Sequence, residues 1–133
     1  MSDSAALVIG AGSSIGSALC ARWQQDDAVS RVFAVSRQPA AGHEHDGHPP
    51  IINIPSDYAE ASIAQTCATI KTLMDENQLD GISRVCICNG ILHNENVWPE
   101  KRIEDLDTDS LVEVFTINSV IPLLWLKALI TLV

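Results

Sequence analysis

An apolar run that leads directly into a glycine-rich turn and then a helix is the feature that most constrains this chain. Residues 5–9 are all apolar, residues 10–16 carry three glycines and two serines, and residues 15–25 have apolar side chains at helical spacing. A continuous apolar run is typical of a strand covered on both faces, as in parallel sheets. The order therefore predicts the first strand–turn–helix unit of an α/β fold.

The alternation of strand and helix patterns continues along the chain, interrupted by one loop where a second crossover helix is expected. We predict strands over residues 31–36, 51–54 and 85–88, helices over 58–76 and 111–133, and a loop over 38–50. Such an order requires parallel strands joined by crossovers. We therefore expect residues 1–133 to form one incomplete α/β domain, a Rossmann-type, doubly wound parallel sheet of about four strands and three helices.

Charge and hydropathy exclude several classes of protein. Eight basic residues against 17 acidic ones give a net charge of −9, which disfavours nucleic acid and anionic membrane surfaces as partners. The hydrophobic fraction of 47% is too high for a disordered acidic chain. No uninterrupted apolar stretch reaches the roughly 18 residues of a membrane span, and the start of the chain lacks the pattern of a signal peptide. We expect a cytoplasmic protein that binds neither nucleic acid nor membranes.

The cysteines and histidines do not predict a disulfide framework or a metal site. Cys86 and Cys88 alternate in a strand pattern, so they share one face, and without a secretory signal we expect reduced thiols. His43, His45 and His48 have a spacing that can bind a metal. A loop rich in proline and glycine more often carries solvated histidines, so we predict no metal ligands.

The final segment, residues 123–133, is apolar on nearly every side of its predicted helix. A helix of this kind must be covered by other protein. Four strands and three helices offer little cover, so either a partner packs on the segment or the natural chain continues beyond residue 133. We expect continuation, and we expect a homo-oligomer, a dimer or tetramer, formed through this helix.

The glycine-rich turn is the candidate binding element for a nucleotide. A glycine turn between a first strand and helix lets the backbone approach a pyrophosphate, which the positive end of the helix attracts. The spacing is Gly-x-Gly-x-x-x-Gly, with isoleucine where the common dinucleotide motif has its third glycine. The alternative is a purely structural turn. We predict pyrophosphate contacts from Gly10, Gly12, Ser13, Ser14, Ile15 and Gly16.

The end of the second predicted strand indicates which nucleotide is bound. NAD-specific sites place a carboxylate there, on the ribose 2′-hydroxyl. This chain has Ser36 and Arg37 instead, and no acidic residue until Glu44. Arginine pairs with a 2′-phosphate, and serine can donate a hydrogen bond to it. We therefore predict NADP, with NAD less favoured.

Four separated features resemble the short-chain dehydrogenase/reductase family. They are the turn bounded by Gly10 and Gly16, with Ser14 in place of the family's middle glycine; Asp57-Tyr58 after the third strand; Asn89-Gly90 after the fourth; and Asn118 in the last helix. Residues 89–106 are also similar to the subgroup of bacterial C-factor signalling proteins. The resemblance extends over the whole chain but corresponds only to the N-terminal half of the family.

This resemblance implies roles for the residues that carry it. Asp57 would bind adenine and Tyr58 would flank it, while Asn89, Gly90 and Ile91 would lie at the ribose on the nicotinamide side. Two alternatives stay open: Asp57 can be a helix N-cap, and Asn-Gly can be a turn that only ends a strand.

Asn118 is the predicted catalytic residue, because the family uses the main-chain carbonyl of this asparagine to hold a water in a proton relay. Helix geometry gives an independent reason for a free carbonyl: Pro122 lacks the N–H that would bond the carbonyl of Asn118. We predict a kink at this point. The alternative is a kink that only eases packing.

The chain lacks the rest of the family's catalytic machinery. The family orients the substrate carbonyl with a serine and delivers the proton from a Tyr-x-x-x-Lys pair. The only tyrosine here is Tyr58, and Ser62 stands four residues after it. The resemblance thus implies an NADP-dependent oxidoreductase for a small carbonyl or alcohol, seen without its catalytic half and inactive alone. The alternatives are a non-catalytic nucleotide-binding or signalling protein and a structural fragment that oligomerises through its last helix.

Overall fold

Four parallel strands form a single sheet in the order β3-β2-β1-β4. The computed structural model describes residues 3–38, 47–91, 94, 95, 97 and 102–133. The strands are β1 Ser4–Ile9, β2 Arg31–Ser36, β3 Ile52–Pro55 and β4 Gly81–Ile87. β1 lies in the middle, with Leu7 opposite Phe33 of β2 on one side and Val85 of β4 on the other. The predicted α/β fold with an incomplete Rossmann-type sheet is confirmed.

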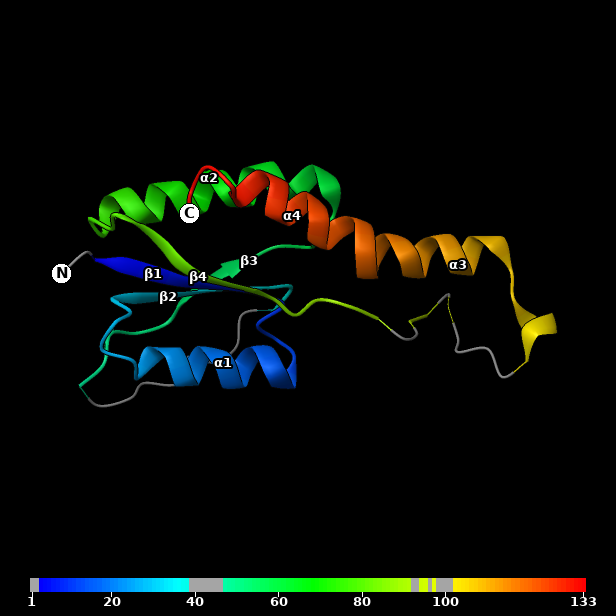
Figure 1. Cartoon of the computed structure of the whole chain (residues 1–133), viewed down its shortest axis with the longest axis horizontal. Coiled ribbons are helices and arrows are strands. Elements are labelled where there is room, and N and C mark those ends of the chain that lie inside the picture. The colour runs from blue at the N-terminus through cyan, green and yellow to red at the C-terminus, as the bar shows by residue number, and fades with distance from the viewer. Residues whose placement is uncertain (1–2, 39–46, 92–93, 96, 98–101) are drawn as a thin grey trace.

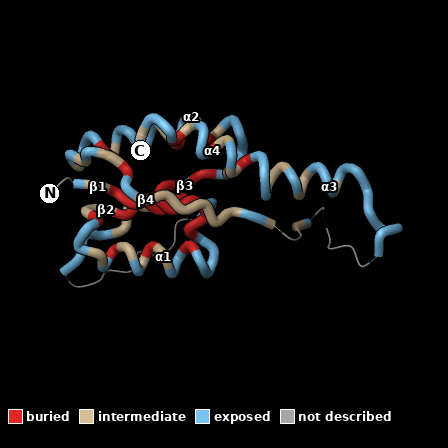
Figure 2. The backbone as a smooth tube through the Cα atoms, in the orientation of Figure 1, coloured by how far each residue is buried: buried red, intermediate tan, exposed pale blue. Residues whose placement is uncertain are grey.

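Helices cover both faces of the sheet (Figure 1). α1, Ser14–Gln24, packs on one face, while α2, Glu60–Glu76, and α4, Ile121–Leu129, pack side by side on the other. The strand side chains alternate between two hydrophobic clusters: Leu7 lies in the α2/α4 cluster, and Val8 lies in the α1 cluster. Figure 2 shows the buried residues concentrated in β1, β2 and the helix faces turned toward them. This double cover explains why the first strand is apolar throughout.

The last helical region is one long rod with an interruption in its hydrogen bonding. α3, Thr108–Phe115, is followed by a π-helical turn, η2, Thr116–Val120, and then by α4. The N–H of Ile121 bonds the carbonyl of Thr116, five residues back instead of four. Pro122 follows at once, and a proline without an N–H favours such a local change in register. The π-turn shows that the helical hydrogen bonding changes beside Asn118, whereas the predicted kink and the free main-chain carbonyl of Asn118 stay predictions.

By length and composition, the rod Thr108–Leu129 is apolar enough to cross a membrane, with a mean hydropathy of 1.5. This is weak evidence, because core helices pass the same test. Ile121, Trp125 and Leu129 of α4 are buried against the sheet, whereas α3 extends past the sheet edge (Figures 1 and 2). The core of the domain therefore accounts for the apolar residues on one side of α4, while the most apolar part of the rod is only 6% buried.

Several predicted boundaries were wrong by a few residues. β4 begins at Gly81 and not at residue 85. The prediction missed its first residues because polar residues alternate with apolar ones there. The last helix begins at residue 108, where the Asp107 side chain accepts the N–H of Ser110, and it ends at Leu129. Residues 37, 38 and 47–51 carry no helix or strand, and residues 39–46 of the predicted loop lie outside the described part of the chain. A short 3₁₀-helix, η1, Ile103–Asp105, precedes α3.

Candidate functional site

The segments that follow the four strands meet at one end of the sheet. The carbonyl of Val35 in β2 accepts the N–H groups of Gly10 and Ala11, at 2.9 and 3.0 Å. The N–H of Ser56 after β3 bonds the carbonyl of Ser36, and the N–H of Cys88 after β4 bonds Ile9 at 2.7 Å. This is the edge where open parallel sheets bind ligands. The sheet therefore gathers most of the predicted site residues at one place.

Two positions in the glycine-rich turn require glycine. Gly10 has φ +85°, and a Cβ there would lie 2.7 Å from the N atom of Asn89. A Cβ at Gly16 would collide with the carbonyl oxygen of Gly10, so glycine lets α1 begin directly against the turn. Gly12 is different, since its nearest neighbour would be the Cβ of Ser36 at 3.8 Å. The turn is therefore closely packed on its inner side and open at Gly12.

The first turn of α1 presents unpaired N–H groups to solvent. Ser13 is the N-cap; its hydroxyl accepts the N–H of Gly16 at 3.0 Å and donates to the carbonyl of Gly10 at 3.0 Å. Ser14 and Ile15 are exposed, and their N–H groups have no acceptor within the helix. A site with such donors attracts anions. The Ser13 hydroxyl is already used in capping, so its contribution to a phosphate site stays a prediction.

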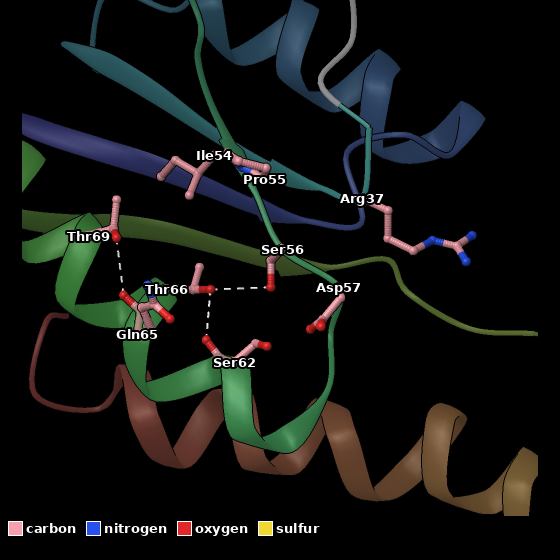
Figure 3. Close-up of a pocket in the computed structure, with 9 residues that line it drawn as sticks. All are labelled: Arg37, Ile54, Pro55, Ser56, Asp57, Ser62, Gln65, Thr66 and Thr69. Carbon is pink, nitrogen blue, oxygen red and sulfur yellow. Dashed lines mark hydrogen bonds between the residues drawn. The ribbon is translucent and has the colours of Figure 1, made fainter.

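Ser36 and Arg37 differ in how available they are to a ligand. Ser36 is buried, and its hydroxyl donates to the carbonyl of Gln38 at 2.7 Å. The side chain of Arg37 extends away from α2, at the edge of a surface cleft (Figure 3). Because Arg37 is exposed, its side chain can turn toward an anionic group without breaking a contact in the core.

An open cleft of about 520 Å³ lies between the end of β3 and the start of α2 (Figure 3). Its lining is rich in hydroxyl groups and includes Arg37, Ile54, Pro55, Ser56, Asp57, Ser62, Gln65, Thr66 and Thr69. The buried Thr66 hydroxyl lies 3.2 Å from the Ser56 hydroxyl and 2.9 Å from the carbonyl of Ser62. These bonds fix the β3–α2 connection and thereby position Asp57.

Asp57 is exposed and held by its neighbours. The Ser62 hydroxyl and the N–H of Ala59 donate to its carboxylate and hold its pKa below the usual range, the Ser62 contact having the larger effect. The Ala59 N–H lies 2.9 Å from Asp57 Oδ1. Asp57 is not the N-cap of α2, because that position is taken by Ala59. The N-cap alternative was therefore wrong by two residues, and the carboxylate keeps free acceptor capacity.

Tyr58 lies between the β3 segment and the glycine turn. Its backbone has φ +63°, and its hydroxyl donates to the carbonyl of Val35 at 3.0 Å. Burial raises the pKa of the phenol, and this outweighs the opposing effect of the Arg37 charge. A neutral phenol whose proton is already bonded is suited to packing and positioning and not to proton transfer, and the predicted place of Tyr58 beside adenine stays a prediction.

Asn89 carries the clearest sign of a missing partner. Both polar atoms of its side-chain amide are buried and have no hydrogen-bond partner within the described structure. Buried polar groups are normally paired, and the Asn89 amide is one of three side chains whose buried polar atoms have no partner in the described part of the chain, with Gln24 and Trp125. The backbone N of Asn89 faces Gly10. The role of Asn89 at the ribose and its alternative, a turn that only ends the strand, both stay predictions.

Asn118 connects the rod to the segment after β4. Its side chain accepts the N–H of Ile91 at 2.6 Å and donates to the carbonyl of Ile91 at 2.7 Å. A Cβ at Gly90 would lie 3.1 Å from Asn118 Oδ1, so glycine permits this approach. The structure thus gives the side chain a positioning role that the sequence analysis did not foresee. The relay role of the main-chain carbonyl stays a prediction.

Cys86 and Cys88 have their Sγ atoms 3.4 Å apart, which confirms that they share a face. Burial, with a smaller contribution from Cys86, raises the pKa of the Cys88 thiol to about 11, and burial raises that of Cys20 to about 11. The described residues contain no cluster of three metal-ligating side chains. Of the three loop histidines, His43 and His45 lie outside the described residues.

Sequence reasoning missed the residues that support the candidate site through hydrogen bonds. Ser56, Ser62 and Thr66 support Asp57, and the carbonyl of Val35 joins the turn to Tyr58. In the sequence, serines and threonines near the start of a helix look the same whether they support a binding site or only cap the helix. The only available signal was the high density of hydroxyl residues between 56 and 72.

Comparison with known proteins identifies the fold. No protein-family model matches the chain, and no protein of curated function matches its sequence. Solved structures do match: an NADPH-bound carbonyl reductase from chicken fatty liver is 19% identical with a TM-score of 0.75, covering 99% of this chain and 49% of that one. A carbonyl reductase from Pseudomonas aeruginosa is 22% identical with a TM-score of 0.71, over 98% of this chain and 56% of that one.

A short-chain dehydrogenase/reductase from Serratia marcescens, solved as a double mutant, is 15% identical with a TM-score of 0.67, over 98% of this chain and 52% of its own. The chain therefore has the fold seen in short-chain dehydrogenases/reductases, which confirms the fold that the sequence resemblance implied. It spans about half the length of the structures it matches.

Proposed function

We propose that the chain is the cofactor-binding, N-terminal half of an NADP-dependent oxidoreductase of the short-chain dehydrogenase/reductase family, similar to the C-factor-like subgroup. The observation that carries the proposal is the orphaned, buried amide of Asn89 at the strand end, beside a turn that excludes any Cβ at Gly10. A structural turn can also require glycine at positive φ, so the unpaired amide is the feature that favours a bound ligand. The NADPH-bound state of one matched structure supports the choice of ligand class.

The residues present fit a dinucleotide phosphate. The free N–H groups of Ser14 and Ile15 would hold the pyrophosphate, with Gly12 allowing its close approach and Gly16 letting α1 begin directly against the turn. Arg37 would pair with the 2′-phosphate, because it is exposed and can reorient.

The remaining predicted residues would bind the two ends of the dinucleotide. Asp57, with its low pKa, stays ionised at neutral pH and can accept from the adenine amino group. Asn89 would bond the ribose on the nicotinamide side, where Gly90 and Ile91 form the wall. All of these residues lie on segments that the sheet brings together.

The bound nicotinamide would supply the hydride that reduces a carbonyl carbon or receives one from an alcohol. Within this chain Asn118 would fix the Asn89–Ile91 segment through its side chain, and its main-chain carbonyl would hold a water for proton transfer. The serine and the Tyr-x-x-x-Lys pair that complete the chemistry are not in these 133 residues. We therefore propose that they are supplied by further chain and that the 133 residues alone bind cofactor without turnover.

The cellular setting belongs to the same proposal. An acidic charge of −9 and four free cysteines favour a soluble protein of the cytoplasm. Phe115, Leu123, Leu126 and Ile130 are apolar and exposed along the rod, and this surface would pack in a homo-oligomer or under the remaining chain. The partners are a small carbonyl or alcohol substrate and a second copy of the chain, with no nucleic acid and no membrane.

Nucleotide affinity tests the proposal. Isothermal titration should show that the chain binds NADPH more tightly than NADH, and Arg37→Glu should weaken NADPH binding by about tenfold or more while leaving NADH binding nearly unchanged. Arg22→Glu makes the same change of charge on the exposed last turn of α1, away from the strand ends, and should change neither affinity. Binding of neither nucleotide would leave a structural fragment as the better explanation.

A further inference from the structure

Tyr58 has a strained backbone in a place where no standard helix geometry explains it. Among the described residues, Tyr58 and Gln78 are the non-glycine residues with positive φ, at +63° and +56°. Gln78 follows the last residues of α2, where the left-handed conformation commonly ends a helix. Tyr58 instead precedes α2. Strain of this kind persists only where the surroundings enforce it, and it gathers at ligand sites.

The tyrosine hydroxyl shares its acceptor with the glycine-rich turn. The Val35 carbonyl receives the Tyr58 hydroxyl at 3.0 Å and the N–H groups of Gly10 and Ala11 at 2.9 and 3.0 Å. A carbonyl oxygen has two lone pairs, so these three donors crowd one acceptor and depend on one another's geometry. The segment after β3 is thereby tied to the turn after β1, across β2.

We propose that Tyr58 is a positioning residue that couples the adenine side of the site to the pyrophosphate side. The proposal rests on the function proposed above. The hydroxyl bond holds Tyr58 in its strained conformation and keeps the turn at Gly10 in the geometry that a phosphate needs. A site that is already ordered before binding loses less conformational entropy when the ligand binds, so the ligand binds more tightly. The probe that reaches both sides without nicotinamide is adenosine 2′,5′-bisphosphate.

Affinity and hydrogen exchange together test the coupling. Tyr58→Phe keeps the ring and removes one hydrogen bond, so it should weaken binding of adenosine 2′,5′-bisphosphate by about fivefold. In the free protein it should also speed exchange of the Gly10 and Ala11 amides while leaving the Gly81 amide, at the other end of the sheet, unchanged. Thr72→Val is the matched control, because it also removes a hydroxyl-to-carbonyl bond, from Thr72 to Ala68, but on an exposed helix face.

The outcomes separate the two proposals. If the unmodified chain does not bind the bisphosphate, the proposed function fails and the coupling fails with it. If it binds and Tyr58→Phe binds within twofold of it, only the coupling is overturned. Weaker binding without faster exchange at Gly10 and Ala11 also overturns it, because the hydroxyl would then affect the ligand without acting through the turn.

A measurement on the chain without substitution covers the case in which Tyr58→Phe does not fold. Tyr58 is the only tyrosine, so 3-fluorotyrosine gives a single fluorine resonance. Binding of the bisphosphate should shift that resonance, and binding without a shift would refute the coupling.

Discussion

At the scale of single residues, the strongest evidence lies in backbone conformation and in polar atoms without partners. Gly10 is fixed by its φ of +85° and by the Asn89 backbone that faces it. Asn89 is notable because its buried amide bonds nothing in the described structure. The sequence could predict a tight turn at the glycines, because glycine is the residue type that adopts positive φ most readily. It could not predict the orphaned amide, because pairing depends on which loops the fold brings together.

Gly10→Ala should lower the free energy of unfolding by about 2 kcal/mol or more, because a left-handed alanine costs roughly 1–2 kcal/mol before the contact with Asn89 is counted. Urea denaturation measures the change. Gly12→Ala is the control and should be nearly neutral, since its Cβ meets nothing closer than 3.8 Å. Equal losses in the two variants would show that the backbone at Gly10 is not as described.

The Cys88 thiol should react slowly at neutral pH. Burial, assisted by Cys86, raises its pKa to about 11, so the rate of alkylation by iodoacetamide should still climb about tenfold per pH unit up to pH 10. The alkylation rate of glutathione in the same tube should level off at a lower pH. Cys86→Ala removes a contact that raises the pKa and should shift the Cys88 profile to lower pH. A profile unmoved by that substitution would argue against the 3.4 Å contact.

Asp57 should titrate below the usual range of an aspartate. Its folded-state pKa is depressed, chiefly by Ser62 and then by the Ala59 N–H, so its contribution to stability is present above its unfolded pKa of about 3.9 and is lost as pH falls through the folded pKa. Carboxyl ¹³C chemical shifts measured against pH report the midpoint. Ser62→Ala should raise that midpoint, whereas Thr69→Ala, which also faces the cleft, should not.

At the scale of elements, the rod from α3 to α4 joins the domain core to the site. Its C-terminal part is anchored by Trp125 and Leu129, and its π-turn places Asn118 beside the segment after β4. Pro122 made an interruption predictable, because a missing N–H has a definite consequence four residues earlier. The π form and the side-chain pairing with Ile91 were not predictable, because both depend on where the rod lies relative to β4.

Asn118→Ala should release the segment after β4 from the rod. The two hydrogen bonds to Ile91 would be lost at an exposed site, so the expected cost is about 1 kcal/mol, with much faster hydrogen exchange at the Ile91 amide. Asn77→Ala, which removes asparagine bonds at the end of α2, should leave exchange at Ile91 unchanged. Unaltered protection of Ile91 in Asn118→Ala would mean that the bridge does not form in solution.

At the scale of the whole molecule, the parallel arrangement of the strands was predictable, and the cleft beside them was not. The apolar runs and the turn chemistry indicate parallel strands, and the comparisons confirm that fold over nearly the full chain. The positions of the candidate residues after the strands were predictable, because parallel strands place their carboxyl ends at one edge of the sheet. The hydroxyl-rich cleft was not, since it forms from a helix face that sequence periodicity assigns only as exposed.

The central claim is that this edge of the sheet binds a dinucleotide phosphate. The most direct measurement is a titration of the isotopically labelled chain with NADPH, followed through backbone and side-chain amide resonances. The claim predicts that Gly10, Ile15 and the side-chain amide of Asn89 shift together, while Gly81 at the opposite end of β4 does not move. Saturating NADPH with no change at these three residues, or with changes confined to the exposed face of α4, would contradict it.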